Sequence, residues 1–388
     1  MTPIKIIILV ESYFQQRDYR RYGVEILLKN GFVVEVWEVF RPWRTKYANT
    51  YRPTDPSSYS SIRHLYSIPE VCASLRTLCP SDVIIASLGQ SRSTAPIYRC
   101  LENEGLFFGG ILLATAFPGK TARQWRPKAL ATWIKNCVCR VLFANRSAQR
   151  LRFVILCGGT VLGGSAGRAP LSGQVWGHAL DYDIFLEAGG REARSTQEHI
   201  VFLDEYVPFH PDYLDLGIAA PNTAEEYYPK LNQLFDRLEH ELKLPVVIAA
   251  HPRAKYENSA YFDGRRIVGG DTCAMVRKAA LVVSHCSTAN NFTVIYGKPS
   301  LSVLTNGLRR SFYGPYIQAM AYCLGGPMIN IDTSWELDLE RLLRVDEARR
   351  SEYYESIIKR PGTPEKNTWQ IFTEFIHRRV PDDTRCPA

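Results

Sequence analysis

A His-Pro-Arg turn at residues 251–253 follows an apolar run of five residues, and its side chains could bind a phosphate group. Pro252 ends the predicted strand because proline has no backbone N–H to donate. His251 is therefore expected at the carboxyl end of that strand, where an imidazole can donate a proton or a hydrogen bond to a phosphoryl oxygen. Arg253 adds a second phosphate contact. An ordinary turn histidine is the alternative, and His210, which begins another His-Pro pair, ranks lower because no apolar run leads directly into it.

A second junction between an apolar run and a polar loop lies at residues 281–291. Ser287 or Thr288 could cap the helix that the following residues predict. A helix N-terminus presents backbone N–H groups without partners in the helix, so these hydroxyls and amides together could hold a phosphate. A plain cap without a ligand is the alternative. The residues expected to bind the phosphate-bearing ligand are Arg253, Ser284, Ser287, Thr288 and Asn290.

Three carboxylates also follow predicted strands. Asp204 and Glu205 come directly after the apolar run 200–203, and either could act as a base or a nucleophile if it faces a ligand. A structural cap or an ion pair is the alternative for this pair. Glu11 follows the first apolar run of the chain and is another candidate base, with a loop contact as its alternative.

The elements that would position these groups alternate between strand and helix in two successive series. The N-terminal series predicts strands at 4–10, 32–37, 83–86 and 106–113, and helices at 18–31, 71–78 and 95–104. The C-terminal series predicts strands at 200–203, 245–250, 281–284 and 300–304, helices at 224–242, 272–280 and 288–296, and a mainly helical tail over 335–376. Glycine is frequent over 156–190, which indicates loops and short strands before a boundary near residue 195.

The fold class that this order predicts is α/β, with two Rossmann-like, doubly wound domains that face each other across a cleft. We expect domain boundaries of 1–195 and 196–388, with an acceptor in the first domain and a nucleotide sugar in the second. This is the GT-B layout of many glycosyltransferases. Sugar-nucleotide epimerases and several periplasmic binding proteins share it, so the layout alone does not fix a function.

The pairing of a strand-terminal His-Pro with a later Ser-x-x-Ser-Thr segment, within residues 200–305, resembles the donor domain of bacterial GT-B enzymes that use CMP-activated acidic sugars. These are the sialyltransferases and Kdo transferases of surface polysaccharide assembly. The resemblance implies that His251 serves the donor phosphate and the leaving group, and that Ser287 with Thr288 binds that phosphate. The family often has two adjacent serines where this chain has Ser-Thr.

The same resemblance leaves the mechanism open. An inverting sialyltransferase uses a carboxylate of the N-terminal domain as base, which would favour Glu11, whereas a retaining Kdo transferase uses a carboxylate nucleophile, which would favour Asp204. The implied function is transfer of a CMP-activated acidic sugar, of Kdo or nonulosonate type, to a glycan or lipid-linked acceptor. A UDP-sugar transferase or a sugar-nucleotide epimerase is the alternative, and a catalytically silent binding module is a third.

We expect neither a metal ion nor another cofactor, because a CMP-sugar carries a single phosphate and needs no divalent cation to offset a diphosphate. The pair Asp181 and Asp183 has the spacing of an Asp-x-Asp metal motif. It precedes an apolar pair near the expected domain boundary rather than following a strand of the donor half, so we discount it as a metal site.

The net charge of +8 is concentrated in one part of the chain. Residues 105–180 contain no Asp or Glu but ten Lys or Arg. A predicted helix from 127 to 152 would place Lys128, Lys135, Arg146 and Arg150 in one cationic stripe. We expect this stripe to contact an anionic membrane surface or a lipid-diphosphate acceptor, with an ordinary solvated helix face as the alternative.

Other classes of protein fit the sequence less well. A nucleic-acid binder is disfavoured because the sequence has no helix-turn-helix, zinc-finger or RNP signature, and its pI of about 8.9 is moderate. The ten cysteines are scattered, which indicates reduced thiols rather than a disulfide framework. With no apolar run of membrane-spanning length, the expected location is the cytoplasm, at the inner face of the membrane if the basic stripe binds lipid.

Overall fold

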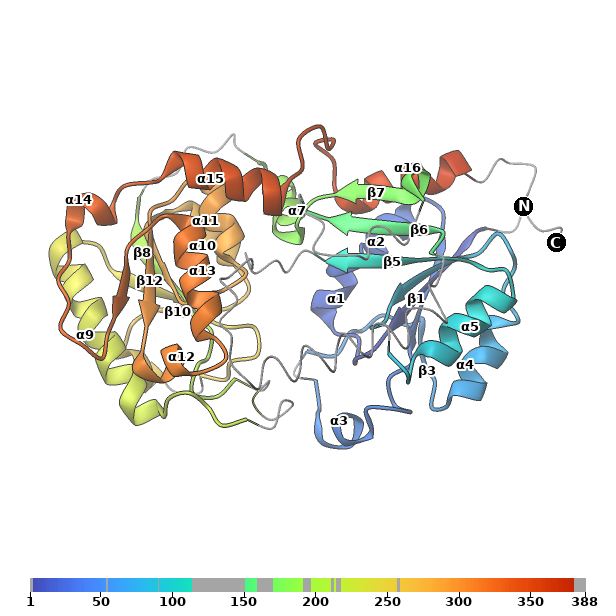
Figure 1. Cartoon of the computed structure of the whole chain (residues 1–388), viewed down its shortest axis with the longest axis horizontal. Helices are drawn as coiled ribbons and strands as arrows, with labels where there is room; N and C mark the ends of the chain where they lie inside the picture. The colour runs from blue at the N-terminus through green and yellow to red at the C-terminus, as the bar shows by residue number, and fades with distance from the viewer. Residues whose placement is uncertain are drawn as a thin grey trace, which may run out of the picture. The chain divides into compact units, whose positions relative to one another are not determined.

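The computed structural model describes residues 3–53, 55–89, 91–113, 151–158, 170–190, 197–210, 213, 218–256 and 259–379. These residues form two compact units (Figure 1). The first unit takes the described residues before 114, those from 151 to 177 and those from 363 onwards, and the second takes residues 178–362. This division differs from the expected 1–195 and 196–388, because the chain leaves the first unit earlier and returns to it at the C-terminal end.

The first unit is built on a sheet of seven parallel strands among the described residues. Their order is β3 (Ile62–His64), β2 (Val33–Glu38), β1 (Lys5–Val10), β4 (Val83–Ser87), β5 (Phe107–Leu113), β6 (Phe153–Cys157) and β7 (Gln174–Gly177). Its helices include α1 (Gln16–Arg21), α2 (Val24–Lys29), α3 (Thr45–Thr50), α4 (Ile68–Leu75), α5 (Ala95–Asn103) and α16 (Thr368–Arg379).

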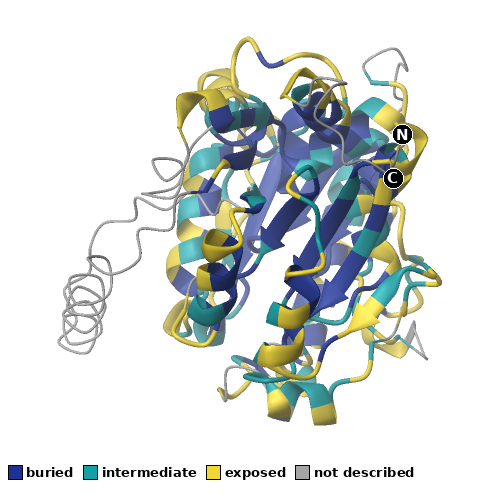
Figure 2. Cartoon of the chain, turned by 90° about the vertical axis from the view of Figure 1, so that its right-hand side faces the viewer, coloured by how far each residue is buried: buried dark blue, intermediate teal, exposed yellow. Residues whose placement is uncertain are grey.

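Strand β1 is buried on both faces, as its apolar sequence predicts. Ile6 and Ile8 pack into a core with Phe372 of α16, while Ile7 and Leu9 point to the opposite face and pack with residues of α4 and α5. Successive side chains of a strand alternate between faces, so one continuous apolar run supplies both cores. Figure 2 shows the buried strands between helices whose outer surfaces are exposed.

The helix predicted at 18–31 is interrupted at Gly23, which lies between α1 and α2 in the left-handed conformation with φ of 56°. The indole of Trp369 in α16 packs directly against this glycine, and its Nε1 donates to the carbonyl of Arg21 at 3.0 Å. A Cβ at position 23 would lie 2.0 Å from Trp369 Cγ. The break therefore makes room for the C-terminal helix.

Substituting Gly23→Ala is expected to destabilise the first unit by about 2 to 4 kcal/mol, through overpacking together with backbone strain. Gly31→Ala is the matched control. Gly31 also has a positive φ, of 82°, but no atom lies within 4 Å of a Cβ at that position, so only a strain of about 1 kcal/mol is expected. Urea unfolding followed by fluorescence measures both, and equal losses would contradict a steric role for Trp369.

The second unit is built on a sheet in which the described residues form six parallel strands. Their order is β10 (Ile267–Val268), β9 (Val246–Ala249), β8 (His199–Leu203), β11 (Ala279–Ser284), β12 (Ser300–Leu304) and β13 (Met328–Asn330). Its helices include α7 (Leu180–Glu187), α9 (Ala224–Leu242), α10 (Thr272–Arg277), α11 (Asn290–Tyr296), α12 (Asn306–Arg310), α13 (Gly314–Leu324), α14 (Leu339–Leu342) and α15 (Glu347–Tyr353).

The longest helix among the described residues, α9, has the bounds that its sequence predicts. Thr223 caps it by accepting from the backbone N–H of Glu226, whose side chain accepts from the N–H of Thr223 in return. The buried face of α9 includes Tyr227, Leu231 and Phe235. This helix thus covers the second sheet next to the loops that follow β8 and β9.

Both sheets reverse their strand order once. In the first sheet the chain runs outward from β1 to β3 and then from β4 to β7 in the other direction; in the second it runs from β8 to β10 and then from β11 to β13. This order defines two doubly wound, Rossmann-like domains, as the sequence predicted. Ligands of such sheets bind outside the carboxyl ends of the strands where the order reverses, here between β1 and β4 and between β8 and β11.

Candidate functional site

Glu205 follows β8 and binds the segment that follows β11, at the position where the strand order of the second sheet reverses. Its Oε1 accepts from the backbone N–H groups of Cys286 at 2.7 Å and His285 at 3.1 Å, and the thiol of Cys286 contacts Oε2 at 3.5 Å. Burial raises the pKa of Glu205 from its ordinary 4.5 to about 7, and the neighbouring Asp204 adds to the rise, while the two N–H contacts oppose it. A carboxyl group that titrates near neutral pH can act as either an acid or a base.

Asp204, by contrast, is buried, with 4% of its surface exposed. Its Oδ1 accepts from the N–H of Tyr206 at 2.9 Å, and its Oδ2 accepts from the hydroxyl of Tyr256 at 2.7 Å and the N–H of His251 at 3.2 Å. Burial raises its pKa despite these contacts. This geometry fits a residue that holds the loops after β8 and β9 together better than the nucleophile suggested for Asp204.

Tyr206, which follows the carboxylate pair, adopts the left-handed backbone conformation with φ of 52°. For a residue with a side chain this costs about 1 kcal/mol or more, and such strain is concentrated at functional sites. Its ring lies 5.4 Å from that of Tyr256 and 5.3 Å from that of Phe209, measured between ring centres. The turn therefore fixes the directions in which Asp204 and Glu205 leave the strand.

The two His-Pro turns of the sequence meet at this edge of the sheet. The rings of His210 and His251 lie edge to face with their centres 4.9 Å apart. Arg253 joins both: its backbone N–H donates to Nδ1 of His251 at 3.2 Å, and its Nη2 lies 3.2 Å from Nε2 of His210. All three side chains are half-buried. The structure thus brings together three basic side chains, of which the sequence analysis had favoured His251 and Arg253 and ranked His210 lower.

The four polar residues predicted between the end of β11 and the start of α11 divide into two pairs. Ser284 and Asn290 are buried, and the Asn290 amide donates to the Ser284 hydroxyl at 2.9 Å, which fits an internal role better than the predicted ligand contact. Ser287 is half-buried and accepts from the N–H of Ala289 at 3.3 Å, while Thr288 is exposed. Ser287 and Thr288 are therefore the members of this group that can reach a ligand.

A further histidine of this loop, His285, has a structural role that sequence reasoning missed. It is fully buried, with Nδ1 2.7 Å from the carbonyl of Val303 and Nε2 2.7 Å from the hydroxyl of Tyr227. A carbonyl only accepts, so Nδ1 carries the hydrogen and Nε2 accepts from the tyrosine. Burial lowers the pKa of His285 to about 4, so the ring is neutral and joins α9 to β12.

Glu11 occupies the equivalent point of the first sheet, between β1 and β4. Its Oε1 accepts from the backbone N–H of Gly89, just beyond β4, and its carbonyl accepts from Nη1 of Arg44 at 2.9 Å. Each unit therefore has a glutamate that leaves the first strand of the reversal and binds the loop after the neighbouring strand. A role for Glu11 as a base stays a prediction.

The first unit also carries a cationic and aromatic cluster that was not predicted. Buried Glu38, at the end of β2, accepts from Arg41 at 3.1 Å and contacts Nδ1 of His64 at 2.8 Å. The Arg41 guanidinium lies over the rings of Tyr13, Phe40 and Tyr66, at 5.3, 4.8 and 4.9 Å from their centres. Because these residues come from three separate segments, no local sequence pattern marks the cluster.

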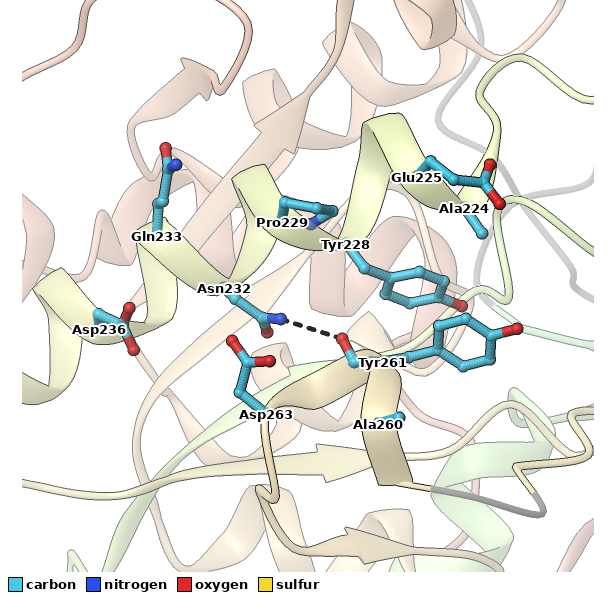
Figure 3. A pocket seen from close by; sticks show the side chains of 10 residues that line it. All are labelled: Ala224, Glu225, Tyr228, Pro229, Asn232, Gln233, Asp236, Ala260, Tyr261 and Asp263. Carbon is cyan, nitrogen blue, oxygen red and sulfur yellow. Dashed lines mark hydrogen bonds between the residues drawn. The ribbon is translucent and has the colours of Figure 1, made fainter.

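A cavity of about 370 Å³ lies between α9 and the short 3-10 helix at Ser259–Phe262 (Figure 3). The rings of Tyr228 and Tyr261 stack along one side, with centres 4.5 Å apart. The hydroxyl of Tyr228 is 3.4 Å from that of Tyr256, which donates to Asp204. None of the predicted site residues lines this cavity, although this chain of hydroxyls connects its wall to the carboxylate pair.

The remaining predictions concern a metal site, the Asp181 and Asp183 pair, and the basic stripe. The described part of the chain holds no group of three His, Cys, Asp or Glu side chains placed to bind a metal ion. Asp181 of the discounted Asp-x-Asp pair lies in α7 and accepts from the amide of Asn291 at 2.7 Å. The four residues of the basic stripe, Lys128, Lys135, Arg146 and Arg150, lie outside the described residues.

No model of a protein family matches this sequence, and no curated protein matches it either. Solved structures of similar fold include the glycosyltransferase of kitacinnamycin, with 12% identity, 98% of this chain and 100% of that chain covered, and a TM-score of 0.50. The wall teichoic acid polymerase TagF shows 10% identity, with 99% and 90% covered and a TM-score of 0.50. A putative UDP-N-acetylglucosamine 2-epimerase from Listeria monocytogenes shows 10% identity, with 100% and 99% covered and a TM-score of 0.48.

These likenesses show the fold: the chain is an α/β protein with two Rossmann-like domains of the GT-B type. At this level of identity they do not transfer a substrate or a reaction. None of the described helices is both long enough and apolar enough to cross a membrane.

Proposed function

We propose that this protein is a glycosyltransferase, which moves a sugar from a nucleotide sugar to a hydroxyl group of an acceptor. The observation that supports this most is Glu205, a carboxyl group with a pKa of about 7, at the sheet reversal where doubly wound domains bind ligands. The residue beside it, Asp204, accepts from the backbone N–H of His251. A candidate base and a candidate phosphate ligand thus converge on one edge of the second sheet.

In the proposed sugar transfer, Glu205 acts as the base, and His251 and Arg253 bind the leaving phosphate. Oε2 of Glu205 takes the proton of the acceptor hydroxyl as that oxygen attacks the anomeric carbon. The bond from the anomeric carbon to the phosphate oxygen breaks, and the electron pair stays on the phosphate. The ring Nε2–H of His251 and the guanidinium of Arg253 stabilise this negative charge. Glu11 is the second candidate for the base.

The donor is proposed to be a nucleoside-diphosphate sugar, with UDP as the first nucleotide to test. The two histidines and the arginine that meet at this edge supply several N–H donors for the charge of a diphosphate without a metal ion. A CMP-linked acidic sugar is the second candidate, supported by the His-Pro and Ser-Thr motifs. The glycan or lipid-linked acceptor and the contact of the basic stripe with anionic lipid stay predictions.

A thermal-shift screen against UDP, CMP, GDP and dTDP tests the donor class. A nucleotide at about 100 times its Kd stabilises the folded protein by about 2.7 kcal/mol, so the true ligand is expected to raise the Tm clearly. Replacing Ser287 and Thr288 together by alanine should remove most of this rise. The matched control replaces the exposed Thr333 and Ser334 by alanine, with no expected effect.

The pattern of responses separates the candidates. A rise with UDP alone supports the nucleoside-diphosphate donor, and a rise with CMP alone moves the proposal to an acidic-sugar transferase. No rise with any nucleotide would overturn the proposed donor site. A transferase releases the nucleotide only when an acceptor is glycosylated or the donor is hydrolysed, whereas an epimerase converts the nucleotide sugar with no acceptor, so product analysis by NMR distinguishes the two.

A further inference from the structure

The second His-Pro turn, which ranked low in the sequence, is brought against the first by the fold. His210 follows β8, and His251 and Arg253 follow β9, so the three come from two neighbouring strands of the same sheet. The ring of Tyr213 also packs near His210, with centres 5.8 Å apart. Each of the three contacts at least one of the others, so they form one connected group.

The contacts fix which nitrogens carry hydrogen. Arg253 has only donors, so Nε2 of His210 accepts from its Nη2, and Nδ1 of His251 accepts from its backbone N–H. Both imidazoles are therefore neutral in this arrangement, and the hydrogen of His251 is on Nε2, the nitrogen that would donate to an anion. A protonated His210 would have no lone pair for Arg253, so the observed arrangement requires His210 as an acceptor.

We infer that His210 is a positioning residue, which holds the Arg253 guanidinium so that Arg253 and His251 bind one phosphate group together. The inference rests on the proposed function in that the phosphate is taken to be that of the nucleotide donor. A guanidinium has several rotatable bonds, and anchoring one of its nitrogens to His210 reduces the freedom lost when the others bind oxygen. The edge-to-face contact of the two rings keeps His251 at the same place.

Two substitutions separate the acceptor from the ring. His210→Phe keeps an aromatic ring against His251 and Tyr213 but cannot accept from Arg253, whereas His210→Gln keeps a carbonyl acceptor and loses the ring. Calorimetry with pyrophosphate and with UDP is expected to show a loss of affinity of about tenfold for the Phe variant and less than about threefold for the Gln variant. His240→Phe, at an exposed position of α9, is the control with no expected change.

A double-mutant cycle tests whether His210 acts through Arg253. If it does, His210→Phe should cost almost nothing further in a protein that already carries Arg253→Gln. Additive losses, or a Gln variant as weak as the Phe variant with an unchanged Tm, would overturn the inference. A melting curve for each variant identifies any that lose affinity by unfolding, and the cycle is then read on the variants that fold.

The outcomes of the two proposals are distinguishable. If pyrophosphate binds and depends on His210 while no nucleotide binds, the phosphate site stands and the proposed nucleotide donor fails. If UDP binds equally to wild type and to His210→Phe, the donor site stands and the positioning role of His210 fails.

Discussion

Glu205→Gln is expected to reduce turnover by about a hundredfold or more and, at the same time, to raise the free energy of unfolding above pH 7. The loss of activity follows because an amide cannot accept the proton of an acceptor hydroxyl. The gain in stability follows because glutamine removes a charge from a half-buried carboxyl group whose surroundings disfavour the charged form. Its carbonyl oxygen can still accept from the N–H groups of His285 and Cys286.

The sign of the stability change follows from the direction in which the pKa of Glu205 is shifted. Because burial raises the pKa of Glu205 from 4.5 to about 7, the folded protein binds more protons than the unfolded chain between those values. The contribution of Glu205 to stability therefore falls as the pH rises through this window, by about 3 kcal/mol in total, and the full cost is present above pH 7. Glutamine carries no such cost at any pH.

Urea unfolding at about pH 5 and pH 8, with wild type and Glu205→Gln side by side, measures the difference. The variant should gain stability relative to wild type only at the higher pH. Glu336→Gln, an exposed position of the same unit, is the control and should show no such gain. A Glu205→Gln protein that keeps its activity, or that loses stability at pH 8, would remove Glu205 from the proposed mechanism.

His251→Ala has the second large expected effect: a loss of about a hundred- to a thousandfold in kcat with only a few-fold change in the Kd of the donor. The proposed hydrogen bond from His251 to the phosphate would strengthen as the leaving group gains charge, so most of its contribution is expected in the transition state. Steady-state kinetics and calorimetry with the nucleotide measure the two quantities separately. Equal losses in both would assign His251 to ground-state binding, and His240→Ala serves as the exposed control.

The strands that hold the site were predicted closely because each is a buried, nearly continuous apolar run. The predicted 281–284 and 300–304 correspond to β11 and β12 within two residues, and helix α9 matches its prediction. The short edge strands β3, β10 and β13 were missed, since two or three residues of strand leave no periodic pattern. The break at Gly23 was missed because its cause, Trp369, is remote in the sequence.

For the candidate site, the sequence predicted where residues lie better than it predicted what each of them does. Sequence reasoning correctly placed Glu205 and His251 after neighbouring strands, because parallel strands end at the same edge of a sheet. It could not tell Asp204, held inside by Tyr256, from Glu205 beside it. His210 ranked low because its importance comes from a contact with a segment some forty residues away, and such pairing has no signature in one sequence.

The return of the chain to the first unit has a consequence for synthesis on the ribosome. Helix α16 supplies Trp369 and Phe372 to the core beside β1, so the first unit lacks part of its core until that helix has been synthesised. The second unit ends at residue 362, so all of it is synthesised before that helix. Domains generally fold as units during synthesis, so the domain that begins first is expected to finish last.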